Sequence, residues 1–256
     1  MEGMFKGKRF VLMGVANQKS IAWAIAQALH AEGAELAFSY VNEAIEKRWR
    51  PLAEGLGSKV ILPCDVQSDE EIANFFAEIE SRWGRFDGLL HSIAFADKTD
   101  LDNPFIQTTR DGFKLALEVS AFSLIAVSKA AAPLMNDGGS VVTMTYMGSE
   151  RVVPHYNVMG VAKAALESSV RYLAPDLGER GIRVNAISAG PIKTLAAAGI
   201  PKFRELLAQF AETAPLKRNV SLEDVAQSTL YLLSPMSSGV TGEVHYVDCG
   251  FNVMGL

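Results

Sequence analysis

The chain has little cysteine and no surplus of basic residues. Cys64 and Cys249 are the two cysteines among 256 residues, and they lie far apart in no metal-type spacing, so a reduced, cytoplasmic protein is expected. The net charge of −5 and the pI near 5.5 argue against a nucleic-acid-binding surface. The four histidines are scattered without an HExxH spacing, so no metal site is predicted.

Long apolar runs, linkers and hydrolase motifs are also missing. The first apolar run, residues 10–16, is too short to span a membrane, lacks the cleavage site of a signal peptide and predicts a first strand instead. No Pro/Gly/Ser-rich linker, repeat or low-complexity tract divides the chain, so residues 1–256 are expected to form a single domain. The absence of a Gly-x-Ser-x-Gly elbow argues against a hydrolase of that type.

Apolar, β-branched runs alternate along the chain with long amphipathic stretches. Strands are predicted at 9–15, 35–41, 59–65, 88–94, 140–146, 183–188 and 243–248. Helices are predicted at 21–32, 43–56, 70–82, 110–135, 156–178 and 222–233. Apolar strands that alternate with helices indicate an α/β fold, a doubly wound, Rossmann-type parallel sheet of seven strands with helices on both faces.

The segment 191–214 departs from this alternation. Pro191, Gly199 and Pro201 interrupt it, although 195–198 and 203–210 are apolar and compatible with helix. It follows the carboxyl end of a strand, where α/β sheets bind ligands. The segment is either a surface helix pair or a helical lid over an apolar ligand.

A candidate nucleotide site follows the first strand. The turn Gly14-Val15-Ala16-Asn17-Gln18-Lys19-Ser20-Ile21 retains only one glycine of the usual GxGxxG pattern. Ser20 supplies a hydroxyl, and the helix that follows offers free N–H groups to a pyrophosphate. An ordinary strand-turn-helix is the alternative.

The ends of the next three strands bear on the choice of nucleotide. No Arg or Lys stands between Ser39 and Glu43 to neutralise a 2′-phosphate, and Glu43 would repel one, so NADH is favoured. Asp65-Val66 ends the third strand, where the carboxylate either receives the adenine amino group or caps the turn before Ser68. The fourth strand ends in Ser92-Ile93-Ala94, whose small residues allow the backbone to approach a cofactor.

Tyr156 and Lys163 are the strongest candidates for chemistry. Six residues separate them, and seven helical steps of ~100° come within ~20° of two full turns, so a helix would place both side chains on one face. A nearby ammonium favours phenolate and is expected to lower the pKa of the phenol. Tyr146, ten residues earlier, either lies beside a substrate or is an ordinary strand tyrosine. His155 adjoins Tyr156 but points elsewhere on a helix.

These residues together resemble a known family. The turn from Gly14, the run His91 to Ala96, the pair Tyr156 and Lys163, and the block 183–194 are similar, in order, to the bacterial enoyl-acyl-carrier-protein reductases of the short-chain dehydrogenase/reductase superfamily. Most of that superfamily separates Tyr and Lys by three residues, whereas the enoyl reductases separate them by six. Two departures are Val41, where some relatives carry Gln, and Cys249, which replaces the second glycine of an Asp-Gly-Gly run and is expected to have only local backbone effects.

The resemblance implies NADH-dependent reduction of trans-2-enoyl thioesters in fatty-acid synthesis, with acyl carrier protein as the partner and a homotetramer as the assembly. Tyr146, Tyr156 and Lys163 take the catalytic roles. The implied cofactor-binding residues are Gly14, Ser20, Ile21, Asp65, Val66, Ile93, Lys163, Ile192, Lys193, Thr194, Leu195 and Ala196. The implied substrate-binding residues are Ala96, Met159, Ile200 and Phe203. Another carbonyl or alcohol oxidoreductase of the superfamily, or an NAD-binding regulator without turnover, are the alternatives.

Overall fold

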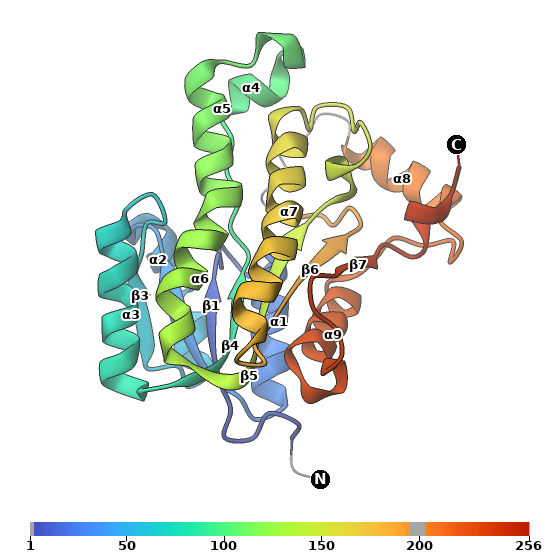
Figure 1. The fold of residues 1–256 in the computed structure, drawn as a ribbon. Coiled ribbons are helices and arrows are strands. Elements are labelled where there is room, and N and C mark those ends of the chain that lie inside the picture. Colours follow the sequence, from blue (N-terminus) through green and yellow to red (C-terminus); the bar gives the residue numbers. More distant parts are fainter. Residues whose placement is uncertain (1–2, 195–202, 256) are drawn as a thin grey trace.

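Seven parallel strands form one sheet in the order β3-β2-β1-β4-β5-β6-β7, in a computed structural model that describes residues 3–194 and 203–255, with backbone only at 203 and 204 (Figure 1). The strands are β1 (Arg9–Met13), β2 (Glu35–Tyr40), β3 (Val60–Pro63), β4 (Phe86–His91), β5 (Met135–Thr145), β6 (Arg183–Ala189) and β7 (Val244–Val247). The predicted Rossmann-type fold is thereby confirmed.

Helices cover both faces of the sheet. The longer helices are α1 (Ile21–Ala31), α2 (Glu43–Gly55), α3 (Asp69–Trp83), α5 (Arg110–Leu117), α6 (Ser123–Ala131), α7 (Val158–Gly178), α8 (Phe203–Thr213) and α9 (Leu222–Leu233). One apolar core joins α1, α2 and α9 to the sheet, and a second joins α3, α6 and α7. Neighbouring residues of β1 alternate between the two cores, as Phe10 and Val11 do, because successive side chains of a strand point to opposite faces.

Every predicted strand is present, with ends that differ from the prediction by a few residues. The largest difference is in β5, which begins at Met135 rather than at 140. The helix expected at 110–135 is composite: α5 and α6 are joined by a π-helical turn, η2 (Glu118–Phe122), and followed by the 3-10 turn η3 (Ala132–Leu134). The short helix α4 (Lys98–Asp102) and the 3-10 turns η1 (Phe105–Gln107), η4 (Met147–Ser149), η6 (Pro235–Ser237) and η7 (Phe251–Val253) have no counterpart in the prediction.

The composite helix is long and apolar enough to cross a membrane by length and composition alone. In this protein 56% of its apolar window is buried, and η2 and α6 contact α7 while α6 also contacts α3. The buried apolar residues Val119, Ala121, Leu124, Val127 and Ala131 of the composite helix belong to the second core.

The direction in which successive strands are added to the sheet reverses at β1. The chain runs outward from β1 through β2 to β3, returns to place β4 on the other side of β1, and continues to β7. Loops at the carboxyl ends of β1 and β4 therefore diverge to opposite sides and leave a crevice between them, the usual ligand position in such sheets. Figure 1 shows α4, the start of α7 and α8 at this end of the molecule, opposite the N-terminus.

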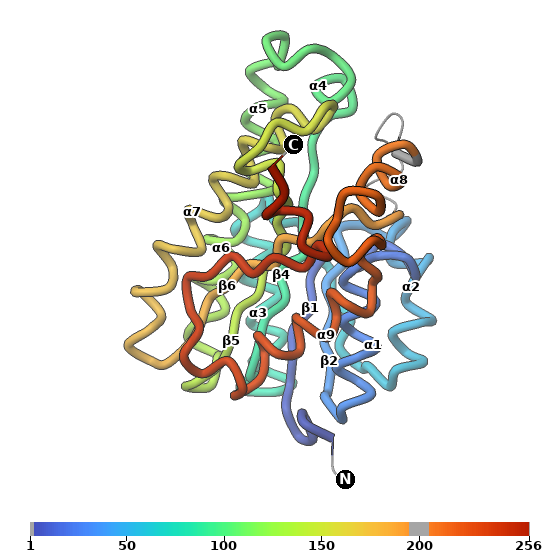
Figure 2. Tube along the Cα trace, turned by 90° about the vertical axis from the view of Figure 1, so that its right-hand side faces the viewer, coloured from blue at the N-terminus to red at the C-terminus, as the bar shows by residue number. Residues whose placement is uncertain are grey.

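The C-terminal segment lies beside this end of the sheet, between α8 and the loop that precedes α7 (Figure 2). The ring of Phe251 in η7 stacks on Phe210 of α8, with 3.6 Å between ring centroids. The Arg151 guanidinium donates to the carbonyl oxygens of Asn252 and Met254 at 2.7 and 3.1 Å. Residues 251–254 thus join α8 to the loop before Tyr156.

Candidate active site

Two adjoining hollows lie at the carboxyl ends of β1, β4, β5 and β6. They have volumes of about 320 and 400 Å³ and share the wall formed by Gly14, Ala16, Ser92, Ile93 and Ala94. The first, here called the tyrosine hollow, is also lined by Ser20, Ile21, Met144, Thr145, Tyr146, Val153, Tyr156, Lys163, Ala189, Gly190, Pro191, Ile192, Thr194 and Leu206. The second, here called the β2 hollow, is also lined by Val15, Ser39, Tyr40, Val41, Asn42, Ile45, Cys64, Asp65, Val66, Gln67, Phe95 and Val119.

The shared wall depends on a glycine. Gly14 follows β1 with a φ of 98°, in the region that favours glycine, and a Cβ at this position would overlap the carbonyl oxygen of Ser92. Ser20 then begins α1, but its hydroxyl donates to the Asn17 carbonyl at 2.7 Å rather than capping the helix. Backbone N–H groups at this helix start are therefore left for a ligand at the tyrosine hollow.

Tyr146 and Tyr156 meet edge to face in the tyrosine hollow. Their ring centroids are 5.0 Å apart at an interplanar angle of 75°. Tyr146 directly follows β5, and Tyr156 directly precedes the N-cap of α7. A Cβ at Gly148 would overlap the Tyr156 ring, so the tyrosine is packed closely against the loop after β5. The Tyr146 hydroxyl is buried without a hydrogen-bond partner in the described part of the chain.

Lys163 lies on α7 with its ammonium against the end of β5. Its Nζ donates to the Met144 carbonyl at 2.8 Å, the one hydrogen bond recorded for that ammonium among residues 3–194 and 203–255. An ammonium has three donors, so two remain for a ligand in the hollow that Lys163 lines. One turn further along α7, the buried Glu167 carboxylate accepts from the Thr145 hydroxyl at 2.6 Å.

The predicted helix start at Tyr156 is wrong by two residues. α7 begins at Val158. The N-cap residue Asn157 has a φ of 42°, which is outside the α-helical region. The helical spacing argument therefore does not describe the pair. Tyr156 and Lys163 nevertheless line the same hollow, because the turn before α7 brings the phenol ring beside the first turns of the helix.

Burial dominates the electrostatics of the tyrosines. It raises the pKa of Tyr156, and the nearby Tyr146 and Glu167 raise it further. Burial also raises the pKa of Tyr146 to about 12. The expected lowering of the Tyr156 pKa is thus wrong, because burial destabilises the phenolate and raises the pKa. Both phenols are neutral near pH 7 and available as hydrogen-bond donors.

Lys163 shows the opposite response to the same environment. Burial lowers the pKa of its ammonium to about 8, against an opposing contribution from Glu167. His91, fully buried behind the site, has a pKa lowered to about 3 by burial and then by Lys163. Its ring nitrogens contact the hydroxyls of Thr143 and Ser123 at 3.0 and 2.8 Å. His91 is therefore neutral, and Lys163 is the group here that titrates near physiological pH.

The β2 hollow contains the residues predicted to surround the adenosine. Asp65 lines it, and its carboxylate also accepts from the Gln67 N–H at 3.0 Å, so the binding and turn-capping interpretations are both compatible with its position. Val66 and Val41 line the same hollow, and Val41 is 50% exposed. The Cys64 thiol in its wall has a pKa raised to about 12, chiefly by burial, so it is a packing residue rather than a nucleophile.

The remaining predicted residues divide into four groups. Gly14, Ser20, Ile21 and Ile93 line the tyrosine hollow, as do Ile192 and Thr194. Lys193 is exposed, Ala96 is half-buried, and neither lines the two hollows. Met159 is buried, and its sulfur accepts from the Ser120 hydroxyl at 3.7 Å. Leu195, Ala196 and Ile200 lie outside the described residues, and of Phe203 only the backbone, at the start of α8, is described.

Sequence reasoning missed several wall residues of the tyrosine hollow. Met144 and Thr145 end β5, Ala189 ends β6 and Gly190 follows it, and Val153 belongs to the loop before α7. The signal for the first four was present, since parallel strands place their carboxyl ends at one edge of the sheet. Val153 has no comparable signal in the sequence.

The two hollows suit a dinucleotide better than a mononucleotide. Their shared wall offers a close backbone approach at Gly14, and the N-terminus of α1 borders the tyrosine hollow. The β2 hollow provides the Asp65 carboxylate, and the tyrosine hollow provides the spare donors of Lys163 and an unpartnered phenol. NAD(H) would thus be held with adenosine by β2 and β3 and nicotinamide by Tyr156. Within the described residues, no group of three or more His, Cys, Asp or Glu could hold a metal ion.

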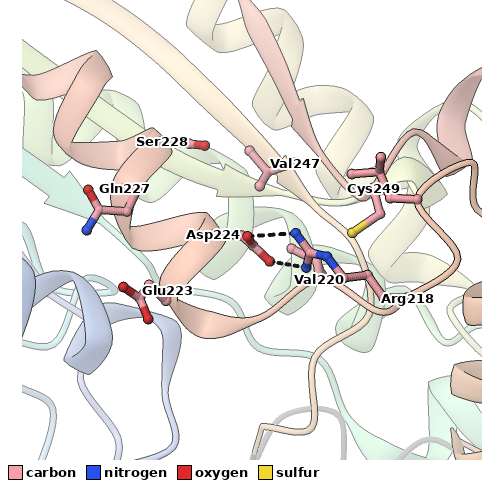
Figure 3. A pocket seen from close by; sticks show the side chains of 9 residues that line it. Arg218, Val220, Glu223, Asp224, Gln227, Ser228, Val247 and Cys249 are labelled. Atoms are coloured by element: carbon pink, nitrogen blue, oxygen red, sulfur yellow. Dashed lines mark hydrogen bonds and ion pairs between the residues drawn. The ribbon is translucent and has the colours of Figure 1, made fainter.

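A third hollow, of about 520 Å³, lies away from this chemistry between α9 and the end of β7 (Figure 3). The Arg218 guanidinium in its wall is paired with Asp224 at 2.5 and 3.0 Å, so its charge is compensated within the protein. Cys249 lines the same hollow with a φ of 59°, a conformation that favours glycine.

The sheet, the glycine turn and the paired hollows define a dinucleotide-dependent oxidoreductase of the short-chain dehydrogenase/reductase type. A family model described as enoyl-(acyl carrier protein) reductase matches residues 14–252. The chain belongs to the enoyl-(acyl carrier protein) reductase family, which confirms the resemblance found in the sequence.

Individual relatives agree with this assignment over nearly their whole length. The enoyl-acyl-carrier-protein reductase (NADH) 1 of Rhizobium meliloti is 56% identical over 99% of this chain and 93% of the relative. A crystal structure of the Anaplasma phagocytophilum enoyl-acyl-carrier-protein reductase with NAD has a TM-score of 0.96 at 48% identity, over 100% of this chain and 98% of that one. The Bacillus cereus reductase with NADP+ and an indole naphthyridinone has a TM-score of 0.97 at 51% identity, over 99% and 100%.

Proposed function

We propose that this chain reduces trans-2-enoyl thioesters of acyl carrier protein to saturated acyl thioesters, with NADH as the reductant, as a step of fatty-acid synthesis. One observation carries the proposal. In a chain of this family, two tyrosines and a buried lysine line the hollow that adjoins the dinucleotide crevice, where a nicotinamide and a thioester can meet.

Each residue of the tyrosine hollow has a task in this reaction. The cofactor supplies the hydride. Tyr156, a neutral phenol whose pKa burial raises further, donates a hydrogen bond to the thioester oxygen as negative charge develops there. Lys163 holds the nicotinamide ribose and keeps positive charge near the phenol, while Tyr146 contacts the substrate. The apolar wall formed by Ile21, Val153, Ile192 and Leu206 excludes water, which strengthens these interactions.

A direct assay tests the function. The purified chain is mixed with NADH and a crotonyl thioester, and the near-ultraviolet absorbance of NADH is followed. Loss of that absorbance with formation of the saturated thioester is expected. No loss with either a carrier-protein or a coenzyme A thioester would contradict the proposal and favour a regulator without turnover. Reduction of NAD by simple alcohols in the same protein would favour a carbonyl or alcohol oxidoreductase.

The pH dependence of the reaction follows from Lys163. Its ammonium has a pKa of about 8, so it loses its proton as the pH rises through that value, and kcat/KM is expected to fall on the alkaline side. The Glu167 carboxylate raises this pKa, so Glu167→Gln should move the alkaline limb to lower pH. Glu179→Gln, an exposed change near the end of the same helix, is the control and should leave the profile in place. An alkaline limb that does not move in Glu167→Gln would contradict this coupling.

Preference for NADH is assigned to the end of β2. Val41 borders the β2 hollow, and no cation stands near it in sequence to neutralise a 2′-phosphate. Val41→Arg is expected to shift the ratio of kcat/KM for NADPH over NADH about tenfold, because a hydrogen bond to a charged group contributes about 1.5–3 kcal/mol. Ile106→Arg, at an exposed apolar position in η1, is the matched control. An unchanged ratio in Val41→Arg would mean that selectivity is decided elsewhere.

The acyl chain is assigned to the side of the tyrosine hollow that faces α8. We assign its binding to Ala96, Met159, Ile200 and Phe203, the substrate-binding residues that the family resemblance implies, and we assign the role of a lid to the segment 191–214. Leu206 of α8 lines the tyrosine hollow, which supports a role for this segment beside the substrate. We assign cofactor binding to Lys193, Leu195 and Ala196 together with Ile192 and Thr194.

We propose the wider setting by analogy with the family. Residues 1–256 work as a single dinucleotide-binding domain in the cytoplasm, and four copies form a homotetramer. The partner is acyl carrier protein loaded with the enoyl substrate. Size-exclusion chromatography with light scattering tests the assembly, and a mass of one or two chains would contradict it.

A further inference from the structure

Tyr156 is held in an unusual stretch of backbone. The residues on either side of it, His155 and Asn157, have φ values of 63° and 42°. Side chains other than glycine rarely adopt this region, and residues held there are concentrated at functional sites when the surrounding structure enforces the conformation. Two such residues around one tyrosine indicate that contacts with other parts of the chain enforce the conformation of this turn.

The Asn157 side chain supplies that restraint. Its Nδ2 donates to the carbonyl oxygens of Asp100, Leu101 and Asn103 at 3.3, 2.9 and 2.8 Å. These carbonyls belong to the end of α4, more than 50 residues away in sequence. We call this three-carbonyl contact the Asn157 clamp.

Helix capping does not explain Asn157. An asparagine at an N-cap normally accepts a hydrogen bond from the second or third N–H of the helix. Asn157 occupies the N-cap of α7 but makes no such side-chain bond. Its side chain instead connects the turn that carries Tyr156 to α4.

The far end of the clamp is itself fixed. The buried Asp100 carboxylate accepts from the backbone N–H of Thr109 at 2.8 Å and from its hydroxyl at 3.2 Å. Thr109 is the N-cap of α5, whose first turn it also caps through Gly112. The Asn157 clamp is therefore anchored to the composite helix of the second core rather than to a loose loop.

The Tyr156 ring is restrained on its other side by packing. It lies edge to face against Tyr146 and leaves no room for a side chain at Gly148. The clamp holds the backbone after the tyrosine, and these two contacts hold the ring. Together they fix the direction in which the phenol hydroxyl enters the tyrosine hollow.

We propose that Asn157 is a positioning residue for the reduction: it sets the place of the Tyr156 hydroxyl by tying the turn after Tyr156 to α4. This inference rests on the proposed function. Displacement of a catalytic group by about 1 Å can cost up to 100-fold in rate, so loss of the clamp should reduce turnover rather than cofactor binding.

The test uses Asn157→Gly and Asn157→Asp. Glycine removes the clamp and accepts the positive φ, whereas aspartate keeps the shape but places a carboxylate against three carbonyl oxygens. Both should lower kcat for a crotonyl thioester about tenfold or more, with an NADH Kd and a thermal midpoint close to those of the parent. Asn74→Ala, an exposed change on α3, is the control for an asparagine outside the site.

A double-mutant cycle separates positioning from a general structural role. In a Tyr156→Phe background the clamp has no hydroxyl to place, so Asn157→Gly should have little further effect on kcat. Retention of kcat in Asn157→Gly within about twofold, or an equal loss in both backgrounds, would overturn the inference. Full activity in Tyr156→Phe alone would instead overturn the catalytic role of Tyr156, and with it the reason for positioning that residue.

Discussion

Tyr156→Phe is expected to lower kcat for enoyl thioester reduction roughly 100-fold or more, with little change in the NADH Kd. The substitution removes one hydroxyl and preserves the ring that packs against Tyr146 and Gly148. The lost interaction forms with the thioester oxygen, and it strengthens as negative charge develops there. It therefore stabilises the transition state more than the bound substrate, and the effect should appear in kcat rather than in cofactor affinity. Steady-state kinetics and calorimetric titration with NADH measure the two quantities separately.

Two further tyrosines sharpen this experiment. Tyr172→Phe, on the exposed side of α7 with 76% of the residue accessible, is the control and should leave kcat unchanged. Tyr146→Phe distinguishes the neighbouring phenols in the hollow. A large loss of kcat in Tyr146→Phe together with full activity in Tyr156→Phe would assign the hydrogen bond to the thioester oxygen to Tyr146 instead. Both hydroxyls are neutral donors near pH 7.

Lys163→Met is expected to weaken NADH binding by about tenfold or more. A hydrogen bond from a charged group contributes about 1.5–3 kcal/mol, and each 1.4 kcal/mol is a tenfold change in Kd. The expectation rests on the two donors that Lys163 keeps free of protein partners in the described structure, in a hollow where burial limits competition from water. Methionine preserves most of the buried stem, so a folding defect is less of a concern than with alanine.

The control for Lys163→Met is the same change at Lys129, which is exposed on α6. Calorimetry with both variants compares loss of charge inside and outside the site, and thermal unfolding detects any change in stability. NADH affinity in Lys163→Met equal to that of the parent would remove the lysine from cofactor binding. Removal of a buried ammonium with a depressed pKa should also leave the variant at least as stable as the parent at neutral pH.

Much of the fold is predictable because the pattern of apolar residues along the chain indicates which segments are buried. Strands covered on both faces read as continuous apolar runs, and all seven were located from such runs. The composite nature of the 110–134 helix was not predictable, because its π-helical turn has the same apolar pattern as the helices around it. α4 was missed for another reason: it is five residues long and depends on contacts with distant segments.

The candidate site shows where sequence spacing stops being informative. Tyr156 and Lys163 do share a hollow, but the turn at His155 and Asn157, not helical periodicity, brings them there. The direction of the Tyr156 pKa shift was wrong at the sequence level because charge proximity can be inferred from spacing, whereas depth of burial cannot. Desolvation then decided the sign.

The stacking of Phe251 on Phe210 constrains how the substrate end of the protein can open. Residues 251–254 connect α8 with Arg151, so a rigid swing of α8 away from the tyrosine hollow must either separate the two rings or pull on the hydrogen bonds at Arg151. An outward movement of α8 is therefore coupled to residues 251–254. A ligand that displaces α8 should strain the backbone of that segment.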